Sequence, residues 1–170
     1  MNAGLRNISI ANNLISVKVI NTKTLEKFEI KKNEINFKYR FSPFQDNDLV
    51  IVSAKLQFKP TNNISELIQT TKTYLKVKTE TQPYHLPSFG SVFKNPANTY
   101  AGKLIDELGL KGFKIGGAEI SKMHANFIVN NSSASSKDIL ELITLIQKKV
   151  LQKKRIFLKP EVRLVGFDYP

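Results

Sequence analysis

The chain has 170 residues, of which 41% are hydrophobic, and it carries a formal net charge of +12. This length and apolar content suit one ordinary domain or two small ones and exclude a disordered chain. There is no cysteine and there are only two histidines, so disulfides, thiolate chemistry and a metal site are not expected. The positive charge predicts attraction to anions, such as nucleic acid, acidic membranes or phosphorylated small molecules.

Residues 1–60 predict a region that is mostly β-sheet. Apolar, β-branched residues alternate with polar ones over 14–20, a pattern typical of a half-buried strand. Residues 25–30 and 49–58 are the expected partner strands, and 37–43 form an aromatic and cationic loop between them.

A helix is expected next. Asn63 followed by Glu66 three residues later is the pattern of a capping box at a helix start. The side chains expected on one face of this helix are Ile64, Leu67, Ile68, Thr71 and Leu75. Prolines interrupt residues 79–87, so this stretch is predicted to be a linker, with a domain boundary between 79 and 80.

The second half of the chain alternates strands and helices. The expected strands are 91–93, 126–130, 156–158 and 162–165, and the expected helices start after Asn98 or Thr99 and after Ser135 or Ser136. Gly109 stands where the first of these helices should end. Together the elements predict an α+β fold.

Two surfaces that a basic protein often binds are not expected as partners. No apolar run approaches the roughly 18–20 residues of a membrane helix, and the N-terminus lacks the layout of a signal peptide, so a cytoplasmic protein without a membrane partner is predicted. The basic cluster over 148–155 ends a predicted helix, where cations complement the helix dipole. No basic stripe is interleaved with aromatics, so nucleic acid is not an expected partner.

Three short stretches bear on chemistry. In 87–96, Ser91 lies between a glycine and two apolar residues, and it is either part of a loop entering a strand or a serine that donates a proton. The paired glycines 116–117 lack the spacing of a dinucleotide site and indicate a turn. Glu161 and Arg163 are two residues apart on a predicted strand and share a face, which by periodicity alone favours a surface ion pair.

Eight motifs occur in a characteristic order. They are MNAG at 1–4, YRFSPFQ at 39–45, TQP at 81–83, GSVFKNP at 90–96, AGKLID at 101–106, LKGFKIGGAEIS at 110–121, HANFIVN at 124–130 and PEVRLVG at 160–166. In this order they resemble the UDP-N-acetylenolpyruvoylglucosamine reductase family, also called UDP-N-acetylmuramate dehydrogenase. The second half has no long tyrosine-bearing loop, which resembles the shorter, second type of that family.

The resemblance implies an oxidoreductase in peptidoglycan precursor synthesis, and hence in cell wall biogenesis, cell shape and cell division. Such an enzyme uses NADPH and FAD to reduce UDP-N-acetylglucosamine enolpyruvate to UDP-N-acetylmuramate. Residues 1–79 would be the C-terminal part of a flavin-binding α+β domain that is mostly sheet. Residues 80–170 would be a small α/β substrate-binding domain, including a closing strand with Glu161.

The resemblance also implies roles for single residues. Ser91 matches the proton-donating serine, Arg40 the arginine that polarises the enolpyruvyl carboxylate, and Glu161 the glutamate near the same carbon. The positions implied on the flavin side are Asn2, Ala3, Gly4 and Arg163, and those implied at the UDP-sugar are Tyr39, Asn95, Lys111 and His124. Lys111 would pair with the diphosphate, which gives the positive charge a purpose.

The chain departs from the family's pattern at its start. The family has a region before MNAG that grips the FAD pyrophosphate, and this region would lie upstream of the start or on a separate partner chain. Leu5, Arg6 and Asn7 stand where the pattern has Ala, Tyr and Gly, and Phe89 replaces a small residue beside the site. The alternative is a truncated, non-catalytic remnant that binds a UDP-sugar without flavin. A basic scaffold or nucleic-acid protein is a third hypothesis.

Overall fold

The computed structural model describes residues 1–5, 8–45 and 47–166, and it combines helices and sheets as the sequence predicts. The chain divides into two compact units, Met1–Asn63 and Ile64–Pro170. Each unit has its own hydrophobic core. A boundary between residues 79 and 80 stays a prediction.

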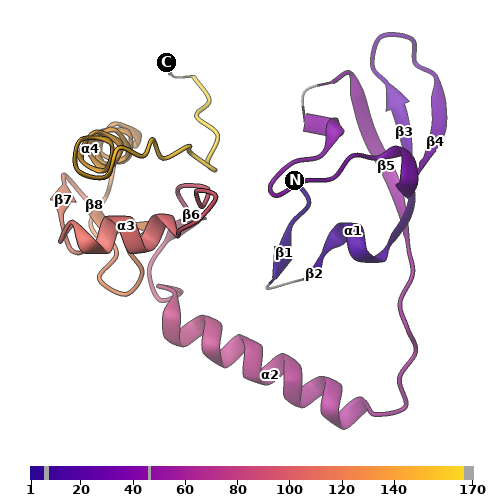
Figure 1. The fold of residues 1–170 in the computed structure, drawn as a ribbon, viewed down its shortest axis with the longest axis horizontal. Helices are drawn as coiled ribbons and strands as arrows, with labels where there is room; N and C mark the ends of the chain where they lie inside the picture. The colour runs from indigo at the N-terminus through magenta and orange to yellow at the C-terminus, as the bar shows by residue number, and fades with distance from the viewer. Residues whose placement is uncertain (6–7, 46, 167–170) are drawn as a thin grey trace. The chain divides into compact units, whose positions relative to one another are not determined.

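The first unit is built on an antiparallel sheet with the strand order β4-β3-β5 (Figure 1). Its elements are β1 (Gly4–Leu5), β2 (Ile8–Ser9), α1 (Ile10–Asn13), β3 (Leu14–Asn21), β4 (Lys27–Lys31) and β5 (Leu49–Leu56), with short 3₁₀ turns at Lys32–Glu34 and Pro43–Gln45. The three longer strands were expected. The second begins later than predicted because the amide oxygen of Asn21 accepts hydrogen bonds from the backbone of Lys23 and Thr24, which closes a turn before the strand.

The core of the first unit is small. Its buried side chains are Leu14, Val17, Val19 and Ile35, and the partly buried Ile30, Phe37, Phe44 and Leu49 pack against them. The central strand β3 supplies most of these residues. The strand β5, by contrast, has no buried residue.

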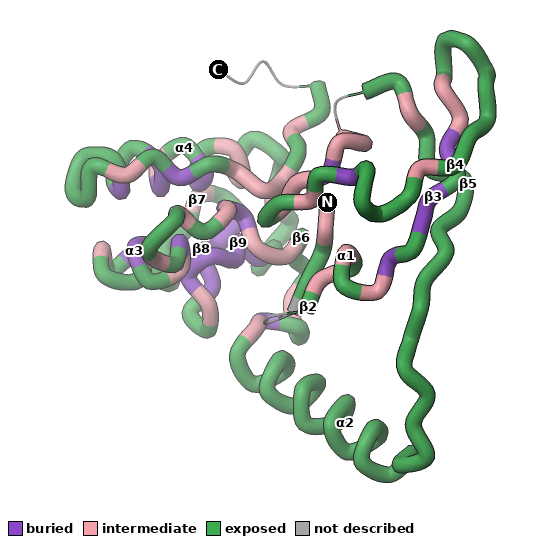
Figure 2. The backbone as a smooth tube through the Cα atoms, turned by 45° about the vertical axis from the view of Figure 1, so that its right-hand side comes forward, coloured by how far each residue is buried: buried purple, intermediate pink, exposed green. Residues whose placement is uncertain are grey.

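The second unit begins with α2 (Ile64–Thr81), an 18-residue helix without a buried residue. Figure 2 draws it as exposed along its whole length. The helix runs further than predicted, because residues 79–81 continue it and the hydroxyl groups of Thr79 and Thr81 bond to backbone carbonyls one turn earlier. The linker predicted over 79–87 is therefore shorter and starts after Thr81.

The rest of the second unit is an antiparallel sheet with helices packed on it. The elements are β6 (Ser88–Ser91), α3 (Ala101–Glu107), β7 (Lys114–Ile115), β8 (Ala118–Ile120), β9 (Phe127–Asn130) and α4 (Ser136–Lys154), with the strand order β6-β9-β8-β7. The helix α4 packs against β7, β8 and α3 (Figure 1). The largest buried side chains of this core are Phe93, Ile105, Ile120, Ile128, Leu142, Ile143, Ile146 and Leu158.

Local hydrogen bonds explain where the helices start and end. Ser135 caps α4 as predicted: its hydroxyl accepts from the Asp138 backbone at 3.1 Å, and the Asp138 carboxylate accepts from the Ser135 backbone at 2.9 Å. These bonds lower the pKa of Asp138. Gly109, with φ of 66°, ends α3 as predicted. The backbone N–H groups of Gly109 and Leu110 donate to Asp106 and Ile105, which is the Schellman pattern.

The predicted closing strands are wrong. Residues 156–158 and 162–165 form no strand, and Pro160 makes only an isolated bridge with Phe93. The carbonyl of Val92 accepts from both Glu161 and Val162, at 2.8 and 3.4 Å, so the alternating ladder stops there. Proline lacks the N–H that a longer ladder would need.

We predict that Gly117→Ala destabilises the second unit far more than Gly109→Ala. A Cβ at Gly117 would lie 1.8 Å from the Ser132 oxygen and 2.5 Å from the Ala134 nitrogen, and both are backbone atoms. At Gly109 nothing lies within 4 Å, so only the left-handed backbone penalises alanine, by about 1–2 kcal/mol. Urea unfolding should show a larger loss for Gly117→Ala, and an equal loss in the two variants would contradict the packing.

Candidate functional site

Tyr39 and Arg40 form the tip of a tight turn in the first unit. Lys38 and Phe41 close this turn with two backbone hydrogen bonds of 3.2 and 3.1 Å. Arg40 has a left-handed backbone with φ of 52°, and its guanidinium carbon lies 5.0 Å from the centre of the Tyr39 ring. A non-glycine residue in this conformation stores about 1–3 kcal/mol of strain, which is common at functional sites. The turn holds the two predicted residues together.

The segment Asn2–Gly4 is tied to the same turn. The side-chain amide of Asn2 donates to the Lys38 carbonyl at 3.1 Å and accepts from the Ala11 backbone at 3.3 Å. Gly4 has no room for a side chain, since a Cβ would lie 2.6 Å from the Ile8 carbonyl oxygen. The departure at residues 6–7 lies outside the described residues.

Three of the four positions expected beside a flavin, Asn2, Ala3 and Gly4, lie in the first unit, and the fourth, Arg163, lies in the second. Ala3 and Gly4 expose their backbone, and Asn2 links that segment to the turn carrying Arg40. Small residues with exposed backbone near a cation fit one edge of a flat, electron-accepting ring system. The residues fit FAD at that edge, and they supply no diphosphate grip of their own among the described residues.

Ser91 and Glu161 lie on two backbone segments of the second unit that are joined by hydrogen bonds. Ser91 ends β6, and the next residue, Val92, is 1% exposed. The backbone N–H of Glu161 donates to the Val92 carbonyl at 2.8 Å, and Lys94 donates to the Lys159 carbonyl at 2.9 Å. The two half-buried residues thus sit on neighbouring backbone segments, although they are 70 positions apart in sequence.

Asn126 holds this arrangement, and the sequence analysis did not single it out. Its side chain is buried, accepts from the Phe93 N–H at 3.0 Å and donates to the Phe93 carbonyl at 2.8 Å. Its own carbonyl accepts from Val92 at 2.9 Å. The available signal was an amide inside an otherwise apolar run, over 125–129. A buried amide in such a run needs partners for its oxygen and its nitrogen.

Asn95 lies at the start of α3. Its amide oxygen accepts from the Ala101 backbone at 3.1 Å. The helix therefore begins after Tyr100, and the predicted caps Asn98 and Thr99 are wrong, because a side chain from outside the helix satisfies its first N–H. Asn95 thus also has a structural role.

Lys111 and His124 both lie in the second unit, and the charge of Lys111 acts on His124. The ammonium of Lys111 lies 2.7 Å from the Asp106 carboxylate. The Nδ1 atom of His124 accepts from the Asn126 backbone at 3.2 Å, which leaves the proton on Nε2. Burial, together with the charge of Lys111, lowers the pKa of His124. The ring stands edge-on to Phe127, and a Cβ at Gly102 would lie 3.2 Å from it.

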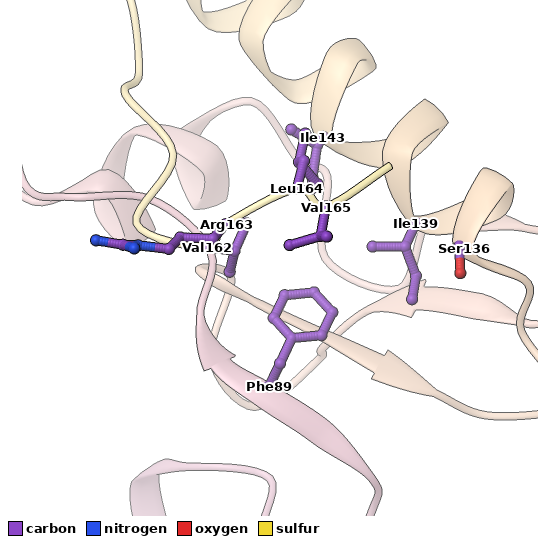
Figure 3. Close-up of a pocket in the computed structure, with 8 residues that line it drawn as sticks. All are labelled: Phe89, Ser136, Ile139, Ile143, Val162, Arg163, Leu164 and Val165. Carbon is purple, nitrogen blue, oxygen red and sulfur yellow. The ribbon is translucent and has the colours of Figure 1, made fainter. Parts of the chain in front are cut away.

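Arg163 lines a pocket of about 470 Å³ in the second unit. The remaining lining residues are Phe89, Ser136, Ile139, Ile143, Val162, Leu164 and Val165. In Figure 3 the phenyl ring of Phe89 faces the apolar lining, and the guanidinium of Arg163 points away from it. Phe89 is 45% exposed, so it borders this pocket and does not crowd the core. The pocket is lined by neither Ser91 nor Glu161.

In the part of the chain that the structure describes, no group of three or more His, Cys, Asp or Glu side chains could hold a metal ion. No helix among the described residues is both long and apolar enough to span a membrane.

We predict that Asn126→Ala costs about 2 kcal/mol or more of unfolding free energy. The change leaves the buried N–H and C=O of Phe93 without their partner, and each unsatisfied group costs about 1–3 kcal/mol. Asn130→Ala is the control, because Asn130 is exposed and its amide oxygen accepts only one backbone bond, from Ala134. Chemical denaturation should separate the two variants, and equal losses would contradict the role given to Asn126.

We predict that the folded chain loses stability as the pH falls from 7.5 to 5.5, and that His124→Gln reduces this loss. The pKa of His124 lies below its ordinary value of 6.5, so the unfolded chain binds this proton more readily. The contribution of neutral His124 is complete above pH 6.5 and falls as the pH drops toward the lowered pKa. Glutamine keeps an acceptor for Asn126, and both proteins keep His85. Identical pH slopes in urea unfolding would rule the effect out.

Comparisons with known proteins show what the chain is similar to. Residues 82–165 match the family model described as UDP-N-acetylenolpyruvoylglucosamine reductase, C-terminal domain. The UDP-N-acetylenolpyruvoylglucosamine reductase of Prochlorococcus marinus subsp. pastoris is 73% identical over 170 residues, which are 100% of this chain and 57% of the relative. That of Synechococcus sp. strain WH7803 is 46% identical over 100% of this chain and 56% of its own length.

A solved structure extends the comparison to the fold. The crystal structure of UDP-N-acetylenolpyruvylglucosamine reductase (MurB) from Thermus caldophilus superposes with a TM-score of 0.77 at 34% identity, covering 95% of this chain and 57% of that one. The chain thus spans little more than half the length of the relatives it matches. The order of motifs, the match to a known fold and the similarity along the whole chain lead to one conclusion: this chain resembles the C-terminal portion of the UDP-N-acetylenolpyruvoylglucosamine reductases.

Proposed function

We propose that the chain is the C-terminal part of a flavin-dependent oxidoreductase that reduces UDP-N-acetylglucosamine enolpyruvate to UDP-N-acetylmuramate. The observation that carries the proposal is that Ser91 and Glu161 lie on neighbouring backbone segments, which are joined by the 2.8 Å bond from the Glu161 N–H to the Val92 carbonyl. A reduction of this kind needs an acid and a charged group at one carbon, and these two residues supply both. The names of the relatives support the same reaction.

In this proposal the chain's own residues handle charge and protons. Reduction of the enolpyruvyl double bond adds a hydride to the carbon far from the carboxylate and a proton to the carbon beside it. Ser91 donates that proton, and Glu161 assists at the same carbon. A positioned donor of this kind accelerates a reaction by about 10²–10⁴-fold. Bound FAD would supply the hydride, which it receives from NADPH.

Arg40 has the chemistry to stabilise the negative charge that develops during reduction. A guanidinium holds a carboxylate through two parallel hydrogen bonds, and a fixed cation is most effective where charge develops. The strained turn fixes the backbone of Arg40, and the contact with Tyr39 restricts its side chain. Asn2, Ala3 and Gly4, tied to that turn, would hold the edge of the flavin. Arg163 is a separate residue to which we assign flavin binding.

The UDP-sugar would bind through Asn95, Lys111 and His124. Tyr39 is a separate residue to which we assign substrate binding. The ammonium of Lys111 is paired with Asp106, so a diphosphate would share or replace that partner. Neutral His124 keeps a proton on Nε2 and can donate a hydrogen bond to phosphate without carrying a charge. In this proposal, part of the chain's positive charge, that of Lys111, binds the diphosphate.

A second candidate function is UDP-sugar binding without flavin. One observation favours it: the second unit has its own hydrophobic core and contains every predicted substrate residue except Tyr39. Binding of the UDP-sugar to the purified chain, in the absence of flavin, would support this function. Binding that requires both flavin and the remaining region would argue against it.

We predict that Ser91→Ala blocks one half-reaction and spares the other. The experiment uses a chimera that joins this chain to the part of the Prochlorococcus marinus reductase outside the match. NADPH should still bleach the flavin absorbance, while reoxidation by the enolpyruvyl UDP-sugar should slow by about 10²–10⁴-fold, because no proton is delivered. Ser88→Ala, in the same strand, is the control.

The two half-reactions separate the possible outcomes. If the Ser91→Ala chimera is reoxidised at the rate of the parent, Ser91 is not the proton donor. If the parent chimera binds FAD but the UDP-sugar never reoxidises it, the proposed reaction is wrong.

A further inference from the structure

The turn that carries His124 fixes its backbone. The hydroxyl of Ser121 accepts hydrogen bonds from the backbone N–H groups of Met123 and His124, at 3.2 and 3.3 Å. The carbonyl of His124 accepts from the Phe127 backbone at 3.0 Å, and the two rings stand edge to face with their centres 4.8 Å apart. Serine hydroxyls that bond to nearby backbone groups stabilise turns of this kind. The backbone of His124 and one side of its ring are therefore held in place.

The tautomer of the His124 ring depends on a long hydrogen bond. The Nδ1 atom accepts from the Asn126 backbone at 3.2 Å, so the proton lies on Nε2. That distance is already at the long end for a hydrogen bond. A small displacement of the ring away from Asn126 would break the bond, and both tautomers would then be populated. The position of the ring thus decides which nitrogen offers a proton.

Gly102 of α3 limits the position of the ring from another side. A Cβ added at this glycine would lie 3.2 Å from Cε1 of His124, the carbon between the two ring nitrogens. The next nearest atoms are the Cβ and the backbone nitrogen of Asn126, at 3.6 and 3.7 Å, which is ordinary van der Waals contact. The imidazole is therefore the group that would have to move, by a few tenths of an ångström.

The backbone of α3 does not itself require a glycine at this position. Gly102 is the second residue of the seven-residue helix, and it is not among the glycines with a positive φ. Alanine is a better helix former than glycine, and in a compatible conformation it also reduces the entropy of the unfolded chain. Glycine is thus the less stable choice for the helix, and the neighbouring imidazole is the feature that favours it.

We propose that Gly102 is a positioning residue for His124. By leaving room for the imidazole, it keeps Nδ1 bonded to the Asn126 backbone and the proton on Nε2, where it can be donated to a phosphate of the UDP-sugar. The inference rests on the proposed role of His124 in UDP-sugar binding. A neutral imidazole donates only from the nitrogen that carries the proton, so the wrong tautomer would lose this contact.

The first test is the tautomer of His124, measured on the full chain without ligand. Nitrogen NMR of the imidazole rings at neutral pH distinguishes a protonated from an unprotonated nitrogen, and a His85→Gln variant assigns the signals, because the chain has only two histidines. The parent should show Nε2 protonated and Nδ1 unprotonated. Gly102→Ala should show a mixture of both tautomers, and a spectrum identical to that of the parent would overturn the proposal.

The second test is a double-mutant cycle in the chimera with the unmatched part of the Prochlorococcus marinus reductase. His124→Ala should raise the Kd for UDP-N-acetylmuramate about tenfold, because a hydrogen bond to a charged phosphate is lost. Gly102→Ala should raise it about threefold or more, because part of that bond is lost. In the double variant Gly102→Ala should add nothing to His124→Ala, because no ring remains to be displaced.

Gly109→Ala is the matched control, because it adds the same methyl group just after α3, where nothing lies within 4 Å. Its left-handed backbone makes alanine costly, so this variant should be less stable than the parent and still bind with the parental Kd. Equal losses of affinity in Gly102→Ala and Gly109→Ala, or additive losses in the double variant, would overturn the proposal. If the parent chimera does not bind UDP-N-acetylmuramate, the proposed function is wrong, and the NMR comparison then decides whether Gly102 sets the tautomer.

Discussion

The arrangement of the second unit depends on the buried amide of Asn126. It saturates both backbone groups of Phe93, and its own carbonyl holds Val92. Because Val92 in turn accepts the N–H of Glu161, one side chain sets the backbone on which Ser91 and Glu161 lie. A buried polar group is costly unless it is satisfied, so the network either forms completely or not at all. The hydrogen bonds of Asn126 therefore hold the backbone on which the candidate site residues lie.

In the first unit, local contacts rather than a buried amide position the candidate site residue Arg40. Its core is small, and the position of Arg40 depends on a short turn, a left-handed backbone and a hydrogen bond from Asn2 to Lys38. Few buried contacts stabilise this region. A unit of this size buries a smaller share of its surface than a large domain does, so each of these local contacts matters for its stability.

The sequence predicted two helix ends and the strands of the first unit. Ser135 and Gly109 were found because caps act over three or four residues, and the strands of the first unit were found because their side chains alternate. The closing strands were wrong because Val92 receives two N–H groups from a segment almost 70 positions away. Asn126 was missed for a similar reason, since its partner Phe93 is 33 positions distant. The role of Arg40 followed from the resemblance, because neither its backbone conformation nor its neighbours can be read from spacing.

The segment after α4 is attached by the buried side chain of Leu158 and by a few separate hydrogen bonds. Gln147 donates to the Leu158 carbonyl, Lys94 donates to the Lys159 carbonyl, and the Val92 carbonyl accepts from Glu161 and Val162. The bonds beyond Leu158 belong neither to the sheet β6-β9-β8-β7 nor to α3 or α4. Local opening of residues 159–162 would therefore carry Glu161 away from Ser91 while the sheet and these helices persist. Separation of Glu161 from Ser91 and global unfolding would then be two different events. A folded molecule could exist in which these two residues are apart.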